Sequence, residues 1–161
     1  MITGRALGAA LEPGLVLFLF GDLGAGKTTL ARGLLAGLGH SGRVKSPTYT
    51  LLEPYAFSRL DLYHFDLYRF RDEQEWHDAG FREHFNPHSV CVVEWPEKAL
   101  HLLPDPDLEL RLAVTAGPEQ PGRALAINAR TVRGTQCLDR MRHALASSKL
   151  SAHFGPLNSP D

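Results

Sequence analysis

A glycine-rich segment near the N-terminus has the residue types and spacing of a phosphate-binding loop. Residues 21–28 read Gly-Asp-Leu-Gly-Ala-Gly-Lys-Thr and match the pattern G-x-x-x-x-G-K-[ST] at every position. Glycines permit the tight turn that directs successive backbone N–H groups toward phosphates. Lys27 would then span the β- and γ-phosphates of a nucleotide, and the Thr28 hydroxyl would bind Mg²⁺.

The segments on either side decide between this interpretation and a plain glycine-rich turn. Residues 15–20 are six consecutive apolar residues, as expected of a parallel strand buried on both faces. Residues 28–38 carry leucines and alanines at helical spacing, and Gly37 and Gly39 supply a stop. Strand, loop and helix therefore follow one another in the order that a P-loop requires, which favours nucleotide binding.

Two acidic residues lie at the ends of other apolar strands. Glu94 ends the run Val90-Cys-Val-Val-Glu94, where a Walker-B-like metal carboxylate is expected, and Asp66 lies near the end of the strand predicted over 60–68. Ligands of doubly wound sheets bind at the carboxyl ends of the strands, so both acids could meet at the γ-phosphate. The alternative for each is a solvated acid at a strand end.

Other residues near these motifs keep two interpretations each. Trp95 could stack on adenine or serve as a core or hinge aromatic, and Arg69 could approach the phosphates or form a surface salt bridge. His64 is predicted to be structural rather than catalytic. The hydroxyl-rich loop with Ser46, Thr48 and Thr50 could sense the γ-phosphate or form a β-turn. The chain has no Asn-Lys-x-Asp motif for guanine, so ATP is favoured over GTP.

Composition and patterning predict one α/β domain over residues 1–146. Its mixed sheet should be mostly parallel at the P-loop core and flanked by helices, with further strands over 48–55, 60–68 and 90–95 and helices over 1–12, 72–79 and around Met141. Residues 107–115 and 123–128 alternate loosely, which predicts an antiparallel hairpin. Residues 147–161 contain mostly small and polar residues and are predicted to be disordered.

Charge and cysteine content bound the partners and the compartment. The 161-residue chain has a formal net charge of −1, so no global basic field argues for unassisted nucleic-acid binding. Two cysteines give neither a disulfide framework nor a zinc pattern. No signal-peptide layout occurs, and no apolar run approaches the ~20 residues of a membrane helix. We expect a soluble, cytoplasmic protein with no membrane contact.

Taken in order, four motifs resemble the TsaE family, also called the YjeE type. These small bacterial ATPases are required for the threonylcarbamoylation of adenosine 37 in tRNA (t6A37). The matching segments are residues 21–29, Val44-Lys-Ser-Pro-Thr-Tyr-Thr-Leu51, Tyr63-His-Phe-Asp-Leu-Tyr-Arg69 and Val93-Glu-Trp-Pro96, and residues 103–107 fit as well. The resemblance covers roughly residues 4–130, and four ordered motifs are far more specific than a P-loop alone.

The resemblance implies a role for each of these residues. Thr28 and Glu94 would be the Mg²⁺ ligands, Asp66 and Lys27 would serve hydrolysis, Trp95 would lie beside the base, and residues 46–50 would form a switch-like loop. Nucleotide would be held by Leu23, Gly24, Ala25, Gly26, Lys27, Thr28 and Thr29. The family works with the proteins TsaD and TsaB. TsaD transfers the threonylcarbamoyl group to tRNA, so this chain would meet tRNA only through the complex.

The leading hypothesis is therefore a slow, partner-stimulated, Mg²⁺-dependent ATPase that is not itself the transferase. One alternative is a small-molecule or nucleoside kinase, although residues 97–122 offer mainly Pro, Asp and Leu in place of an Arg-rich lid. Another is a nucleotide-dependent binding module that never hydrolyses ATP. Release of phosphate by the wild-type chain separates the first from the last.

Overall fold

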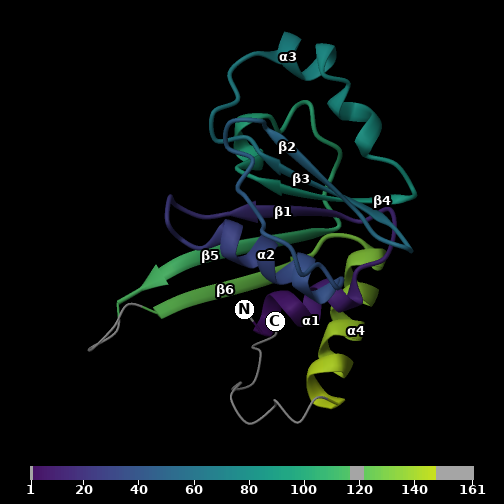
Figure 1. The fold of residues 1–161 in the computed structure, drawn as a ribbon. Coiled ribbons are helices and arrows are strands. Elements are labelled where there is room, and N and C mark those ends of the chain that lie inside the picture. Colours follow the sequence, from purple (N-terminus) through teal and green to yellow (C-terminus); the bar gives the residue numbers. More distant parts are fainter. Residues whose placement is uncertain (1, 117–121, 148–161) are drawn as a thin grey trace.

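The computed structural model describes residues 2–116 and 122–147, which form one six-stranded sheet with helices packed on both faces (Figure 1). The helices are α1 (Ile2–Ala10), α2 (Lys27–Gly37), α3 (Glu73–Asp78) and α4 (Val132–Ser147), with short 3₁₀ helices η1 (Phe81–His84) and η2 (Pro96–Lys98). The strands are β1 (Val16–Phe20), β2 (Leu52–Ala56), β3 (Asp61–Asp66), β4 (Ser89–Glu94), β5 (Leu108–Thr115) and β6 (Gly122–Ala129).

The strand order is β2-β3-β4-β1-β5-β6, with β1 near the centre. The inner strands β3, β4, β1 and β5 run parallel, while β2 and β6 pair antiparallel at the two edges. The predicted mixed sheet and the later hairpin, now β5–β6, are both confirmed. Because β1, β3 and β4 are parallel, their carboxyl ends lie at one edge of the sheet, beside the start of α2.

Each face of the sheet has its own hydrophobic core. Leu17 and Leu19 of β1 pack with α1, α2 and α4, whereas Val16 and Phe18 belong to the second core. That second core contains Trp76 of α3, which stacks against Phe65 of β3. The two cores place α1, α2 and α4 on one face of the sheet and α3 on the other, and Figure 1 shows α3 well apart from the other three helices. Burial on both faces explains why residues 15–20 are apolar without alternation.

Two glycines in α1 allow that helix to lie directly against α2. A Cβ atom at Gly8 would lie 2.1 Å from the backbone oxygen of Leu34, and one at Gly4 would lie 2.9 Å from the Cα of Gly33. The glycines reduce the helical propensity of residues 1–12. They are nevertheless the residues that let α1 pack closely enough to cover Leu34 of α2.

We expect Gly8→Ala to destabilise the fold by about 1–3 kcal/mol, because the added methyl group meets rigid backbone rather than a movable side chain. A loss of stability would point to the contact between the helices, because helix propensity alone favours alanine over glycine by roughly 1 kcal/mol. Urea unfolding measures the difference. The control is Ala9→Ser on the exposed side of the same helix, which should change stability by less than about 0.5 kcal/mol. Equal stability of the two variants would contradict the close contact.

The structure corrects one predicted strand, and most of the predicted C-terminal tail lies outside the described residues. The strand predicted over 48–55 begins only at Leu52, because residues 47–51 form a turn closed by a hydrogen bond from Leu51 N–H to the Pro47 carbonyl. Of the predicted tail, Ser147 ends α4, and residues 148–161 lie outside the described residues. Both cysteines are buried and unpaired. Among residues 2–116 and 122–147, none of the helices has the length and hydropathy of a membrane span.

Candidate functional site

The loop between β1 and α2 has the backbone geometry of a phosphate cradle. Gly24 and Gly26 adopt left-handed conformations with φ of 79° and 107°, which other residues rarely tolerate. Gly26 is the N-cap of α2, and no side chain caps its first N–H groups. Those groups and the positive end of the helix are therefore available to an anion at this point.

Lys27 is almost fully buried at the base of this loop. Its Nζ donates hydrogen bonds to the carbonyl oxygens of Gly21 and Asp22, the latter at 3.0 Å. The same Nζ lies 3.7 Å from the centre of the Trp95 ring. Burial lowers the pKa of Lys27, and nearby carboxylates, Glu94 foremost, oppose that shift. The Lys27 amine therefore lies under an aromatic ring and near several carboxylates.

Glu94, at the carboxyl end of β4, is buried and joined to both neighbouring elements. Its Oε2 accepts a hydrogen bond from Thr28 Oγ1 at 3.0 Å, and its Oε1 lies 2.8 Å from Nε2 of His64 on β3. A hydroxyl and a carboxylate oxygen are the hard ligands that Mg²⁺ prefers. The two predicted metal ligands, Thr28 and Glu94, are therefore side by side.

Asp66, at the end of β3, holds the hydroxyl-rich loop against the sheet. Its Oδ2 accepts hydrogen bonds from Ser46 Oγ at 2.9 Å and Thr48 Oγ1 at 2.6 Å, and its Oδ1 accepts one from the Tyr68 N–H at 3.1 Å. Thr50, predicted with this loop, is exposed and is absent from the residues that line the cavity. Asp66 thus couples the end of β3 to Ser46 and Thr48.

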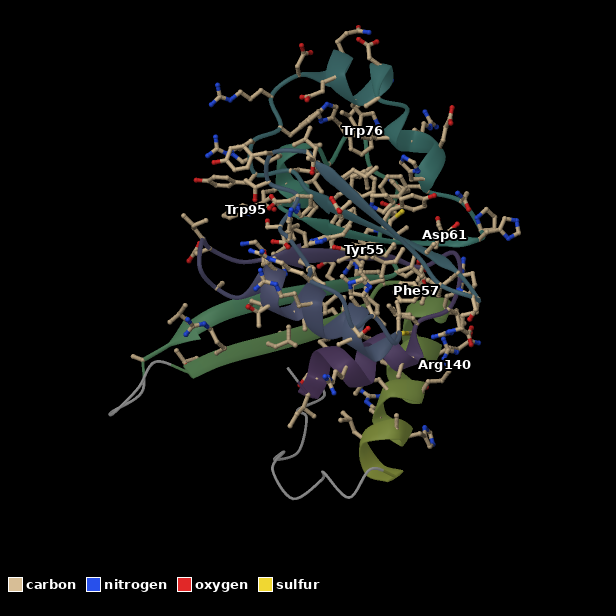
Figure 2. All side chains as sticks on the ribbon, viewed as in Figure 1. Tyr55, Phe57, Asp61, Trp76, Trp95 and Arg140 are labelled. Carbon is tan, nitrogen blue, oxygen red and sulfur yellow. The ribbon has the colours of Figure 1, made fainter. Side chains whose placement is uncertain are left out.

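Trp95 lies beside Lys27 of the glycine loop. Figure 2 shows it at the edge of the sheet where α2 begins, far from Trp76 under α3. Its backbone is left-handed, with φ of 58°, a strained conformation for a large side chain. The ring contacts Lys27 on one side and lies 5.0 Å from the Tyr68 ring. Stacking of the Trp95 ring on a base stays a prediction.

One cavity of about 580 Å³ joins these groups. Its lining contains most of the residues that the sequence predicts, together with Tyr68 and Arg69, while Ala25 is buried beneath the loop. Arg69 stacks on the Tyr49 ring at 4.5 Å, which favours neither of its two predicted roles. The lining residues are Leu23, Gly24, Gly26, Lys27, Thr28, Thr29, Ser46, Thr48, Asp66, Tyr68, Arg69, Glu94 and Trp95.

The chemistry of this lining fits a triphosphate with Mg²⁺. The described residues contain no cluster of three or more His, Cys, Asp or Glu side chains that could hold a metal ion by themselves. Mg²⁺ does not need such a cage, because it is usually bound by one or two carboxylates, water and the phosphates of its substrate. The Thr28–Glu94 pair beside a glycine loop and a buried lysine supplies the protein's share of that arrangement.

Sequence reasoning did not identify the partner of Glu94 or the place of Tyr68. His64 precedes Asp66 by two residues on β3, and alternation along a strand puts both side chains on one face. The two-residue spacing of His64 and Asp66 could therefore have predicted a contact between His64 and Glu94 at the end of the neighbouring strand. Tyr68 carries no such signal, because its position depends on the turn after β3.

The sequence matches known proteins along most of its length. Residues 1–123 match the family model of the "Threonylcarbamoyl adenosine biosynthesis protein TsaE". The chain is 53% identical over 97 residues to the tRNA threonylcarbamoyladenosine biosynthesis protein TsaE of Haemophilus influenzae, covering 60% of this chain and 61% of that protein. Identity to the Bacillus subtilis protein of the same name is 46% over 102 residues, 63% of each chain. These matches span less than two thirds of either relative.

The fold is also similar to a solved structure. The crystal structure of Bacillus subtilis YdiB superposes with a TM-score of 0.67 at 32% sequence identity, covering 88% of this chain and 86% of that chain. Similarity over this share of both chains shows that the overall fold has been seen experimentally.

Proposed function

This chain belongs to the TsaE family, and we propose that it binds ATP with Mg²⁺ in the cavity at the P-loop and hydrolyses it slowly. The observation that carries the proposal is the convergence of a buried P-loop lysine, the Thr28–Glu94 pair and Asp66 on one cavity. Each group alone has a structural explanation. Their meeting at the carboxyl ends of parallel strands supports a common ligand.

In this proposal, residues around the loop bind and neutralise the phosphates. Backbone N–H groups from Gly24 to Thr29 and the start of α2 would face the phosphate oxygens, and the Lys27 ammonium would turn from its carbonyl partners to the β- and γ-phosphates. Thr28 and Glu94 would hold Mg²⁺, which offsets negative charge as the terminal phosphate leaves.

Asp66 would orient the attacking water and accept hydrogen bonds from it at the γ-phosphate end of the cavity. Two hydroxyls, from Ser46 and Thr48, already bond its Oδ2. Water and these hydroxyls would therefore compete for the same carboxylate oxygen. That competition would couple the loop 46–50 to the state of the nucleotide, as in other P-loop switches.

We further propose that hydrolysis serves tRNA threonylcarbamoyladenosine formation by a TsaD–TsaB complex in the cytoplasm. Large exposed side chains support a partner at this site: Leu23 of the cavity lining is 73% exposed, and Tyr49, which stacks on the lining residue Arg69, is 81% exposed. Contiguous exposed apolar patches mark surfaces that another protein covers, and we propose that these two side chains belong to such a patch.

Phosphate release measured with and without TsaD, TsaB and tRNA tests the role. We expect weak turnover by the isolated chain and a clear increase with the TsaD–TsaB pair. Isolated turnover at kinase-like rates of roughly 1–100 s⁻¹ would contradict it. No release above buffer under any condition would leave only a nucleotide-dependent binding module.

Nucleotide binding should also change the fluorescence of Trp95. The chain has two tryptophans, and Trp76 is buried in the second core, so Trp76→Phe leaves Trp95 as the reporter. Because its ring lies over Lys27, movement of that amine toward phosphates should alter the emission when Mg²⁺ and ATP are added. The matched variant Trp95→Phe, which retains Trp76, should show no change. A response from Trp76 alone would contradict the placement.

A further inference from the structure

His64 is a buried polar side chain whose one hydrogen bond in the described structure goes to Glu94. It is 0% exposed, and its Nε2 lies 2.8 Å from Oε1 of Glu94, which is itself 2% exposed. The other ring nitrogen, Nδ1, is buried without a hydrogen-bond partner in the described part of the chain. The imidazole therefore contacts the metal-ligand candidate from inside the protein, away from the cavity that Glu94 lines.

Strand register explains how the two side chains meet. His64 pairs with Val92, and Asp66 pairs with Glu94, across the parallel strands β3 and β4. In-register neighbours point to the same face, and Val92 belongs to the core packed on α2. His64 thus occupies a position on the α2 face where an aliphatic residue would fill the core. A buried imidazole with an unpartnered nitrogen is costly there, and packing alone does not explain it.

The hydrogen bond from His64 to Oε1 determines where the second oxygen of Glu94, Oε2, lies. A glutamate carboxylate rotates readily about its last torsion, with broad and roughly two-fold preferences. Fixing Oε1 on His64 fixes the plane of the group, so that Oε2 meets Thr28 Oγ1. Lys27 lines the same cavity, and a carboxylate that could rotate would be drawn to that amine. Such an ion pair would occupy both the phosphate lysine and the metal ligand.

We propose that His64 is a positioning residue that holds the Glu94 carboxylate toward Thr28 and the cavity for Mg²⁺. The inference rests on the proposed nucleotide binding and adds to it a residue that touches neither nucleotide nor metal. Groups that orient metal ligands from behind commonly affect metal affinity by roughly 10- to 100-fold. The effect of His64 should therefore lie in Mg²⁺-dependent binding rather than in binding of the nucleotide itself.

Two amide substitutions separate positioning from packing. Gln at position 64 can place its amide nitrogen near the site of Nε2, whereas Asn reaches only as far as Nδ1. Calorimetry measures the dissociation constant of the non-hydrolysable analogue AMP-PNP in Mg²⁺ and in EDTA. The value in EDTA divided by the value in Mg²⁺ gives a ratio for each protein, which states how much Mg²⁺ strengthens binding. We expect His64→Asn to reduce the wild-type ratio at least about 10-fold and His64→Gln to stay within about threefold. In EDTA, both variants should bind AMP-PNP with nearly the wild-type affinity. The control His77→Asn, at an exposed position, should keep the wild-type ratio.

The outcomes distinguish this inference from the proposed function. Equal ratios in wild type, His64→Asn and His64→Gln would overturn the positioning role, and so would equal losses in both variants or a loss that persists in EDTA. A wild-type ratio near one would overturn it while leaving nucleotide binding intact. No binding by wild type in either buffer would instead reject the proposed function.

A measurement on the wild-type chain covers the case in which a variant fails to fold. Nitrogen-15 NMR resolves the ring nitrogens of each histidine, and Mg²⁺ would be added to protein already saturated with AMP-PNP. We expect Nε2 of His64 to shift as Glu94 engages the ion, while His77 stays constant. An unchanged His64 signal would overturn the proposal.

Discussion

In the Lys27→Ala variant, we expect binding of ATP to weaken at least about 100-fold, while the fold is retained. Lys27 Nζ has three donors at the base of the glycine loop, two of which now go to backbone carbonyl groups. Hydrogen bonds that involve a charged group contribute roughly 1.5–3 kcal/mol each. Loss of two such bonds to phosphate therefore corresponds to a factor of about 100 or more.

Calorimetry with Mg²⁺ and ATP measures this effect, with thermal unfolding as the check on the fold. The control is Lys45→Ala, which removes an exposed lysine from the loop before Ser46 and should change the affinity less than about twofold. Affinity of Lys27→Ala within threefold of wild type would place the phosphates elsewhere.

The second large effect is expected in catalysis. Asp66→Asn should lower ATP hydrolysis by roughly 10²–10⁴-fold, the usual contribution of a positioned acid–base group, while ATP still binds. The amide has nearly the shape of the carboxylate and can still accept from the Tyr68 N–H. Its NH₂ group can donate to the Ser46 and Thr48 hydroxyls, but it is uncharged and cannot accept a hydrogen bond from water at the position of Oδ2. The substitution thus removes the chemistry and keeps the loop in place.

Single-turnover phosphate release, with and without the TsaD–TsaB pair, measures the loss. Asp61→Asn is the matched control, because Asp61 is exposed at the opposite end of the same strand (Figure 2). We expect its rate to equal that of wild type. If Asp66→Asn hydrolyses ATP at the wild-type rate, another group orients the water. If it fails to bind ATP, Asp66 contributes to nucleotide binding instead.

The parts of the site that sequence reasoning located are those set by local chemistry. The glycine loop, the apolar strand before it and the stripe of α2 each follow from residues within a few positions, so their order predicted the cradle around Lys27. Glu94 and Asp66 were located because each ends a strand, and the carboxyl ends of parallel strands meet at one edge. The alternation of 107–115 and 123–128 similarly predicted the β5–β6 hairpin.

Contacts between distant segments account for what sequence reasoning missed. The hydroxyls of Ser46 and Thr48 bond a carboxylate on another element, which keeps residues 47–51 in a turn despite their strand-forming composition. Trp95 contacts Lys27 from a left-handed backbone position, which sequence patterns do not predict for a tryptophan. His64 acquires its partner from the register of β3 and β4. None of these features depends on propensity within one segment.

Calorimetric titration of the wild-type chain with ATP in the presence of Mg²⁺ tests whether the glycine loop around Lys27 binds the nucleotide. We expect a saturable heat of association, with one nucleotide per chain, that is lost in Lys27→Ala and retained in Lys45→Ala. A titration to millimolar ATP and Mg²⁺ with no heat beyond dilution would contradict it.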